Sequence, residues 1–144
     1  MERTLKELTD IESVCGVYDI YKHCMYMPTK EKFISKMTEY IADPGVKIYI
    51  CLCSGEIKGV IAVSFSDSNQ AEIFGIATDE YMHGCGVGSY MIKQVAALHS
   101  LASIYAETDR DAVGFYQKNG FNIVEEIRDF DGEKVIRYKC TLLI

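Results

Sequence analysis

MHGCGVGSYMI, residues 82–92, is the stretch that decides the fold of this chain. Glycine recurs there at every second position, as Gly84, Gly86 and Gly88, just before residues with helical spacing. Glycine has no Cβ, so its backbone can approach a ligand closely or adopt a positive φ. A helix start also offers unpaired N–H groups and the positive end of the helix dipole. The stretch therefore predicts an anion site, best suited to phosphate.

Two other interpretations of the glycine run stay open at this point, and a third is excluded. The loop holds no lysine of the GKS/T type, which argues against a P-loop. It matches the dinucleotide pattern GxGxxG only in part, although an acidic residue, Glu107, follows about 20 residues later, as that fold requires. A tight turn in a parallel strand–helix–strand crossover is the second open interpretation.

Length and composition predict an ordinary soluble domain. The chain has 144 residues, of which 49% are hydrophobic and 25% are charged. This length fits one domain. No apolar run reaches the ~18 residues of a membrane span. The N-terminal residues MERTLKELTD lack the apolar core of a signal peptide, so a cytoplasmic protein is expected.

Charge and cysteine content exclude two classes of partner. The net charge is −6, from 15 basic and 21 acidic residues, which argues against nonspecific nucleic-acid binding and is compatible with a cationic substrate. The six cysteines show no zinc-site spacing, so no metal is expected. Reduced thiols that serve as small apolar residues are the expected state.

The N-terminal third of the chain predicts two helices. Thr9-Asp10-Ile11-Glu12 is typical of a capping box, and the apolar spacing that follows predicts a helix to about Tyr21. Pro28 opens a second helix with an apolar side, and Asp43-Pro44-Gly45 ends it.

The remaining two thirds predict strands and two further helices. Apolar runs bounded by turn residues predict strands at 46–53, 58–65, 71–78, 103–107, 121–128 and 134–142. Helices are expected at 86–98, with Met91, Val95 and Leu98 facing inward, and at 111–118. Asp131-Gly132 predicts the turn of a C-terminal hairpin. The order of elements predicts an α/β fold with a mixed sheet and a right-handed parallel crossover at the glycine run.

A second motif, ETDRDAVGFYQKNGF, occupies residues 107–121. With it, the chain resembles the GNAT family of acetyl-CoA-dependent N-acetyltransferases. The family's RGxGxG loop matches His83–Gly88, and its FYxKxGF signature matches Phe115–Phe121. The spacing of the motifs and the strand before each also match, over roughly residues 46–140. The resemblance implies one acetyltransferase domain over residues 1–144, with a mixed central sheet of about six to seven strands flanked by about four helices.

The resemblance also implies where acetyl-CoA binds. Main-chain N–H groups of the glycine loop would bind the pyrophosphate, and the end of the preceding strand would pair with the pantetheine arm and present an N–H to the acetyl oxygen. The implied cofactor-binding residues are Ile76, Ala77, Thr78, His83, Gly84, Cys85, Gly86, Val87, Gly88, Ser89 and Asp109.

Two of these residues depart from the family pattern. The family usually has Arg or Gln at the position of His83, so the loop offers less positive charge to the pyrophosphate here, while the backbone N–H groups remain. It usually has Asn at the position of Asp109. An aspartate accepts a hydrogen bond and can cap a helix, but it does not donate as an amide does. An affinity for acetyl-CoA below the family norm is therefore expected.

The catalytic residues come from the same resemblance. Tyr116 matches the family's tyrosine near the cofactor sulfur, and a phenol with a pKa of about 10 stays protonated at pH 7 and can donate to a leaving thiolate. Glu72 matches the glutamate of the histone-acetylating branch and is the first candidate for the base. Glu107 is its rival, and either carboxylate could act through a water. Some family members use no dedicated base, and this alternative stays open.

The acceptor site in this family is built from the first two helices and the final hairpin. The connection Tyr21–Pro28 is rich in tyrosine and methionine and predicts an adaptable apolar wall, with simple packing beneath the helices as the alternative. A small-molecule amine is the favoured acceptor, ahead of a protein amine, and a homodimer is compatible with the family. A noncatalytic acyl-CoA-binding or sensor module on the same fold is the second interpretation of the chain.

Overall fold

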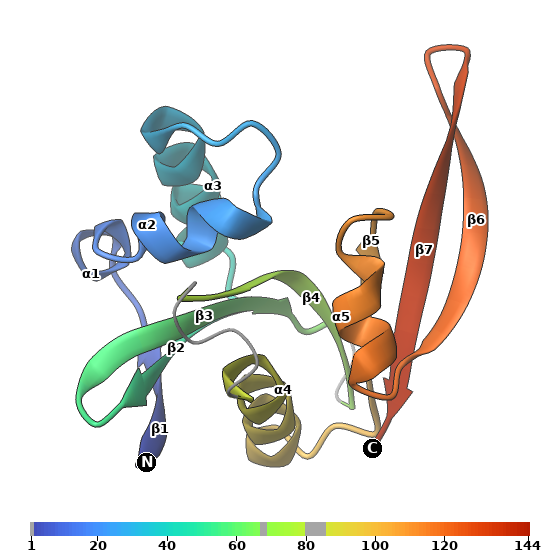
Figure 1. Cartoon of the computed structure of the whole chain (residues 1–144). Helices are drawn as coiled ribbons and strands as arrows, with labels where there is room; N and C mark the ends of the chain where they lie inside the picture. Colours follow the sequence, from blue (N-terminus) through green and yellow to red (C-terminus); the bar gives the residue numbers. More distant parts are fainter. Residues whose placement is uncertain (1, 67–68, 80–85) are drawn as a thin grey trace.

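The computed structural model describes residues 2–66, 69–79 and 86–144. Seven strands of this part of the chain form one sheet, in the order β1-β2-β3-β4-β5-β7-β6. Within that sheet β4 and β5 pair in parallel and the other neighbours pair antiparallel, which confirms the predicted mixed α/β fold (Figure 1). The strands are β1 Arg3–Leu8, β2 Val46–Cys53, β3 Glu56–Ser64, β4 Gln70–Thr78, β5 Ser103–Thr108, β6 Asn122–Phe130 and β7 Glu133–Leu143.

Helices cover both faces of the sheet (Figure 1). One face carries α1 Ile11–Cys15, α2 Tyr18–Tyr21, the 3-10 helix η1 Lys22–Cys24 and α3 Lys30–Ala42. The other carries α4 Val87–Leu98 and α5 Val113–Lys118. Because both faces are covered, β2 and β3 are near-continuous apolar runs rather than alternating ones. No described helix has the length and apolar character needed to cross a bilayer.

Three details of the helices differ from the prediction. The first helix does not continue to Tyr21, because the chain leaves it at Gly16 and restarts as α2. Its N-cap is Asp10, whose side chain accepts a hydrogen bond from the Ser13 N–H at 2.8 Å, rather than Thr9. The expectation that Leu98 faces inward is wrong, since this side chain is 63% exposed at the end of α4.

The strands β4 and β5 separate, and this separation positions the site. They pair over three residues each, from Gln70↔Ser103 to Glu72↔Tyr105. Beyond that point β4 continues to Thr78 along β3, and β5 continues to Thr108 along β7. The sheet therefore opens between the two strands near their C-terminal ends, where the chain enters α4 and α5.

A β-bulge lies in β4 beside this opening. Ala62 pairs with Gly75 and Val63 pairs with Ile73, so Phe74 is the extra residue. A bulge changes which side of the sheet the following side chains face. Ile73 belongs to the core beneath α4, whereas Ala77 belongs to the core beneath α1, α2 and α3.

A histidine at the end of α4 predicts a pH-dependent stability. The His99 Nε2 lies 2.6 Å from the Tyr49 hydroxyl, and its ring lies 4.3 Å from that of Phe65. Burial, with a smaller contribution from Lys47, lowers the pKa of His99 below its ordinary 6.5. The unfolded chain therefore binds more protons below about pH 6.5, so stability falls as pH decreases through that range. We expect the melting temperature of His99→Gln to depend less on pH between about pH 7.5 and pH 5 than that of the wild type. An identical pH dependence in the two proteins would contradict this assignment.

Candidate active site

The N-terminus of α4 is built as the sequence predicts for an anion site. Gly86 precedes the helix with φ +79° and ψ 13°, a left-handed conformation that favours glycine. The Tyr90 N–H is bonded to the Gly86 carbonyl, so the N–H groups of Val87, Gly88 and Ser89 precede the first intrahelical bond. The first turn has no acidic residue, and no described side chain caps it. This end of α4 can therefore accept an anionic group from outside the helix.

Gly88 also brings α4 and α5 together. A Cβ at this position would lie 2.8 Å from two atoms of the Phe115 ring, which is closer than such atoms pack. The third glycine of the run therefore serves the packing of α5 against the start of α4. The predicted loop residues His83, Gly84 and Cys85 lie outside the described part of the chain.

The backbone of β4 forms one wall of the opening. The main-chain amide of Ile76 is directed at the sulfur of Cys24, which comes from η1 on the neighbouring face of the sheet. The Cys24 thiol also donates a hydrogen bond to the Tyr21 carbonyl oxygen at 3.2 Å. The residue as a whole is exposed, but its thiol is enclosed between η1 and β4, and this burial raises the pKa of the Cys24 thiol to about 12. The thiol is therefore neutral at pH 7.

Tyr116 lies on α5 and is only 6% exposed. Its ring packs edge-on against Phe115 and Phe121, each with a centroid 5.1 Å away. Burial raises the pKa of the Tyr116 phenol, and the thiols of Cys140 and Cys24 act on it in the same direction. The phenol is therefore neutral and remains a hydrogen-bond donor over the physiological pH range. The Cys24 thiol thus acts on the pKa of the Tyr116 phenol and also receives the Ile76 amide.

The two candidate bases lie in different surroundings. Glu72 accepts a hydrogen bond from the Tyr105 hydroxyl at 3.2 Å, and its charge acts on the phenol of Tyr40 in α3. Glu107 instead forms an ion pair with Arg128 of the C-terminal hairpin, with N···O 2.9 Å. The structure thus separates the two carboxylates, and Glu72 is the one whose charge acts on a residue of α3.

Asp109 has a structural role in the turn before α5. Its Oδ1 accepts hydrogen bonds from the N–H groups of Asp111 and Ala112, each at 3.0 Å, and its carbonyl accepts one from Val113. The carboxylate therefore holds the turn that leads into α5, in agreement with the predicted capping ability. Its expected contact with a cofactor stays a prediction.

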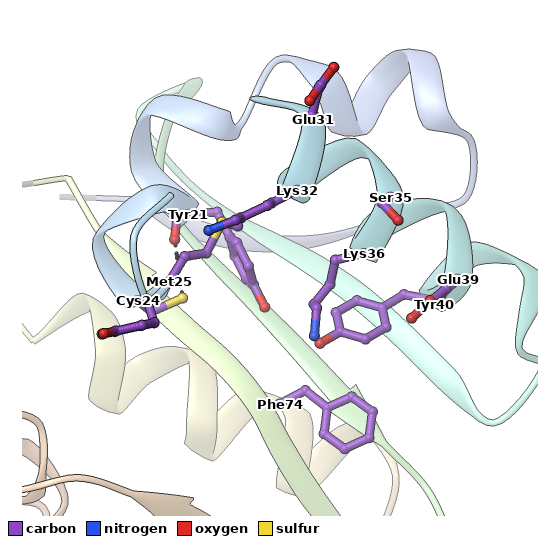
Figure 2. A pocket seen from close by; sticks show the side chains of 11 residues that line it. Tyr21, Cys24, Met25, Glu31, Lys32, Ser35, Lys36, Glu39, Tyr40 and Phe74 are labelled. Atoms are coloured by element: carbon purple, nitrogen blue, oxygen red, sulfur yellow. Dashed lines mark hydrogen bonds between the residues drawn. The ribbon is translucent and has the colours of Figure 1, made fainter. Parts of the chain in front are cut away.

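A pocket of about 650 Å³ lies between α3, η1 and β4 (Figure 2). The sequence predicts part of it, because Tyr21, Cys24, Met25 and Tyr26 of the predicted wall line it. The sequence analysis did not predict that α3 supplies the polar side of the pocket. The i, i+4 spacing of these residues could have indicated that they share one face of the helix. They form two rows, Glu31, Ser35 and Glu39, and Lys32, Lys36 and Tyr40. The bulge residue Phe74 closes the pocket and packs on Tyr40 with ring centroids 5.4 Å apart.

The described fold and site define a class of protein. A parallel strand pair opens beside an uncapped helix N-terminus, with a buried tyrosine from the next helix and a pocket of about 650 Å³ over the sheet. This combination is that of an acyl-CoA-dependent acyltransferase fold. Among the described residues, no group of three or more His, Cys, Asp or Glu is arranged to hold a metal ion.

Comparison with known protein families agrees with this class of fold. Residues 14–121 match the model of the Acetyltransferase (GNAT) family, so the chain belongs to that family. No curated protein matches the sequence. The recognised resemblance to GNAT enzymes is thereby confirmed over three quarters of the chain.

Solved structures show the same fold at low sequence identity. A GNAT acetyltransferase from Elizabethkingia anophelis with acetyl-CoA bound is 22% identical, with a TM-score of 0.70 over 99% of this chain and 98% of that chain. The Escherichia coli ribosomal-protein-S18-alanine N-acetyltransferase is 17% identical, with a TM-score of 0.73 over 99% and 94%. A Vibrio cholerae spermidine N-acetyltransferase chimera is 16% identical, with a TM-score of 0.74 over 99% and 96%. At these identities the likeness shows the fold alone.

Proposed function

We propose that this chain is a single acetyltransferase domain that transfers an acetyl group from acetyl-CoA to a primary amine by direct attack. The observation that carries the proposal is the opening between β4 and β5, flanked by the α4 N-terminus and the buried phenol of Tyr116. Acetyl-CoA supplies the acetyl thioester when bound. The family match and the acetyl-CoA bound to the Elizabethkingia protein support this choice of cosubstrate.

The chain's own residues fit the needs of acetyl-CoA. The N–H groups of Val87, Gly88 and Ser89 bind the pyrophosphate at the positive end of α4, together with the loop residues before them. The backbone of Ile76, Ala77 and Thr78, which β5 leaves unpaired, pairs with the pantetheine arm as an added strand would. The Ile76 amide, which is directed at the Cys24 sulfur in the free protein, exchanges this partner for the acetyl oxygen and stabilises the charge that develops there. Tyr116 donates its phenolic proton to the departing thiolate.

The pocket supports a small amine as the acceptor. Its volume of about 650 Å³ lies within the usual range for small-molecule sites. The relatives include enzymes named for both kinds of acceptor, spermidine and the alanine of a ribosomal protein. The aromatic walls from Tyr40 and Phe74 suit a cationic amine. The lining also carries two carboxylates and two ammonium groups: Glu31, Glu39, Lys32 and Lys36. Glu72 is the proposed base, since Arg128 already pairs with Glu107.

A noncatalytic acyl-CoA-binding module is the second candidate. It is favoured by His83 in the glycine loop and by Asp109, whose carboxylate is engaged in the turn before α5. Such a module would bind acetyl-CoA and release no CoA in the presence of amines, so turnover distinguishes the two functions.

The proposal is tested by measuring CoA release with a thiol reagent. The protein is incubated with acetyl-CoA and a panel of primary amines, including polyamines, aromatic amines, amino acids and short peptides. We expect at least one small amine to raise CoA release about 100-fold or more above the rate without amine. Acetyl-CoA binding without release for any amine would contradict the enzyme and favour the noncatalytic module.

A further inference from the structure

A tyrosine that the proposed mechanism does not yet use lies against the bulge of β4. Tyr21 is 2% exposed, and its phenol packs on Gly75, directly before Ile76. A Cβ at Gly75 would collide with the phenol oxygen of Tyr21, so this glycine makes room for it. The hydroxyl of Tyr21 thus lies beside the amide proposed to bind the acetyl oxygen.

Tyr21 is the centre of a chain of polar groups. Its phenol interacts with the phenol of Tyr40 on one side and with the thiol of Cys24 on the other. Figure 2 shows the phenol oxygen of Tyr21 between the Cys24 sulfur and the ring of Tyr40. The Cys24 sulfur in turn meets the Ile76 amide, and the charges of Glu39 and Glu72 act on the Tyr40 phenol. The chain of polar groups therefore runs from the β4 opening toward the carboxylates of Glu39 and Glu72.

The distance between Glu72 and the Ile76 amide explains why a chain of polar groups is needed. Because of the bulge at Phe74, Glu72 and Ile76 pair with Ser64 and Ile61, three positions apart on β3, which corresponds to roughly 10 Å along a strand. A base must come within about 3 Å of the proton that it removes, directly or through one water. Glu72 therefore cannot take a proton directly from an amine placed at the Ile76 amide, and a relay is needed between the two.

We propose that Tyr21 and Tyr40 form a proton relay from the acceptor amine to the Glu72 carboxylate, an inference that rests on the proposed acetyl transfer. The N–H bond of the ammonium breaks, and its proton goes to the Tyr21 oxygen. The Tyr21 proton passes to the Tyr40 oxygen, and the Tyr40 proton passes through one water to Glu72, whose charge acts on Tyr40. The amine is left neutral, both phenols regain their starting protonation, and Glu72, which is partly exposed, returns the proton to solvent.

The surroundings suit transmission of a proton rather than its storage. Burial raises the pKa of both Tyr21 and Tyr40, so both phenols stay neutral and each can accept on its oxygen while donating its own proton. The other charged groups at the pocket come from α3: Glu31, Glu39, Lys36 and Lys32, the last of which donates to the Met27 carbonyl at 2.9 Å. The neutral Cys24 thiol from η1 faces the relay from the opposite side.

The test uses Tyr21→Phe and Tyr40→Phe, which remove one oxygen each. Without the relay, the rate follows the fraction of amine that is already neutral in solution, which rises about tenfold per pH unit up to the amine pKa of about 10. We expect kcat to fall about 10–100-fold near pH 7 in each variant and to recover to within about threefold of the wild type near pH 10. The double variant should be no slower than either single variant, because both break the same chain.

Tyr18→Phe is the matched control. Tyr18 lies on the same short helix and packs against Phe33 at 5.2 Å, but it does not line the pocket. Its pH profile should match that of the wild type. The relay would be overturned by an equal loss of kcat at every pH in Tyr21→Phe, or by a Tyr40→Phe variant with wild-type kcat. CoA release by the wild type would still support the proposed acetyl transfer in either case.

A second measurement does not depend on turnover. In protein with ¹³C-labelled tyrosine rings, Tyr40→Phe should shift the Cζ resonance of Tyr21, because the partner of its hydroxyl is lost. An unchanged Tyr21 resonance would overturn the relay even in a protein that shows no acetyl transfer, whereas absent transfer with a shifted resonance would contradict only the proposed function.

Discussion

Replacing Tyr116 by phenylalanine is expected to lower kcat by about 100-fold or more, the usual contribution of a positioned general acid. The ring stays in its packing between Phe115 and Phe121, since only the hydroxyl is removed. The affinity for acetyl-CoA should change by less than about threefold, because pyrophosphate binding resides in backbone N–H groups of α4. The measurement is kcat from CoA release together with the dissociation constant of acetyl-CoA from calorimetry.

Tyr138→Phe serves as the control for this substitution. Tyr138 lies on β7 and packs against the same core as Tyr116, but it has no assigned role. It should keep kcat within about threefold of the wild type, as expected for a change outside the reacting groups. A Tyr116→Phe variant with wild-type kcat would remove the general-acid role, and another donor would then have to protonate the thiolate.

Placing a carboxylate in the first turn of α4 is expected to weaken acetyl-CoA binding without lowering the stability of the protein. In Ser89→Asp, the new charge interacts favourably with the helix dipole and should leave the melting temperature unchanged or slightly raised. The same charge repels a pyrophosphate bound by the neighbouring N–H groups. We expect the dissociation constant of acetyl-CoA to rise by about 30-fold or more at low salt, and by less at high salt.

Ser89→Ala shows whether the effect belongs to the charge. The backbone N–H of residue 89 survives this change, so acetyl-CoA affinity should stay within about threefold of the wild type. A Ser89→Asp variant that binds acetyl-CoA as tightly as Ser89→Ala would mean that the pyrophosphate does not lie at the α4 N-terminus.

Much of the fold could be predicted because its signals are local. The apolar run 46–53 coincides with β2, and the Asp131-Gly132 turn has positive φ at both residues, 50° and 86°. In contrast, β1 was not predicted. It reads RTLKEL, with few apolar residues, because it is an edge strand whose ladder with β2 supplies what its sequence lacks.

The site was predictable where glycine or a family motif marks it. The positive φ of Gly86 agrees with the expected conformation of the glycine run, whereas the general-acid role of Tyr116 stays a prediction. The bulge at Phe74 depends on how β4 pairs with β3, which no local pattern specifies. The contact of Tyr21 with Gly75 depends in turn on that bulge, so the proposed relay emerges only from the folded chain.

The central claim is that this protein binds acetyl-CoA at the opening between β4 and β5. Calorimetric titration with acetyl-CoA, alongside NAD and ATP, tests it most directly. The account predicts a dissociation constant on the order of micromolar for acetyl-CoA, about 8 kcal/mol of binding free energy, and no response to NAD or ATP. Absence of acetyl-CoA binding, or tighter binding of either nucleotide, would contradict it.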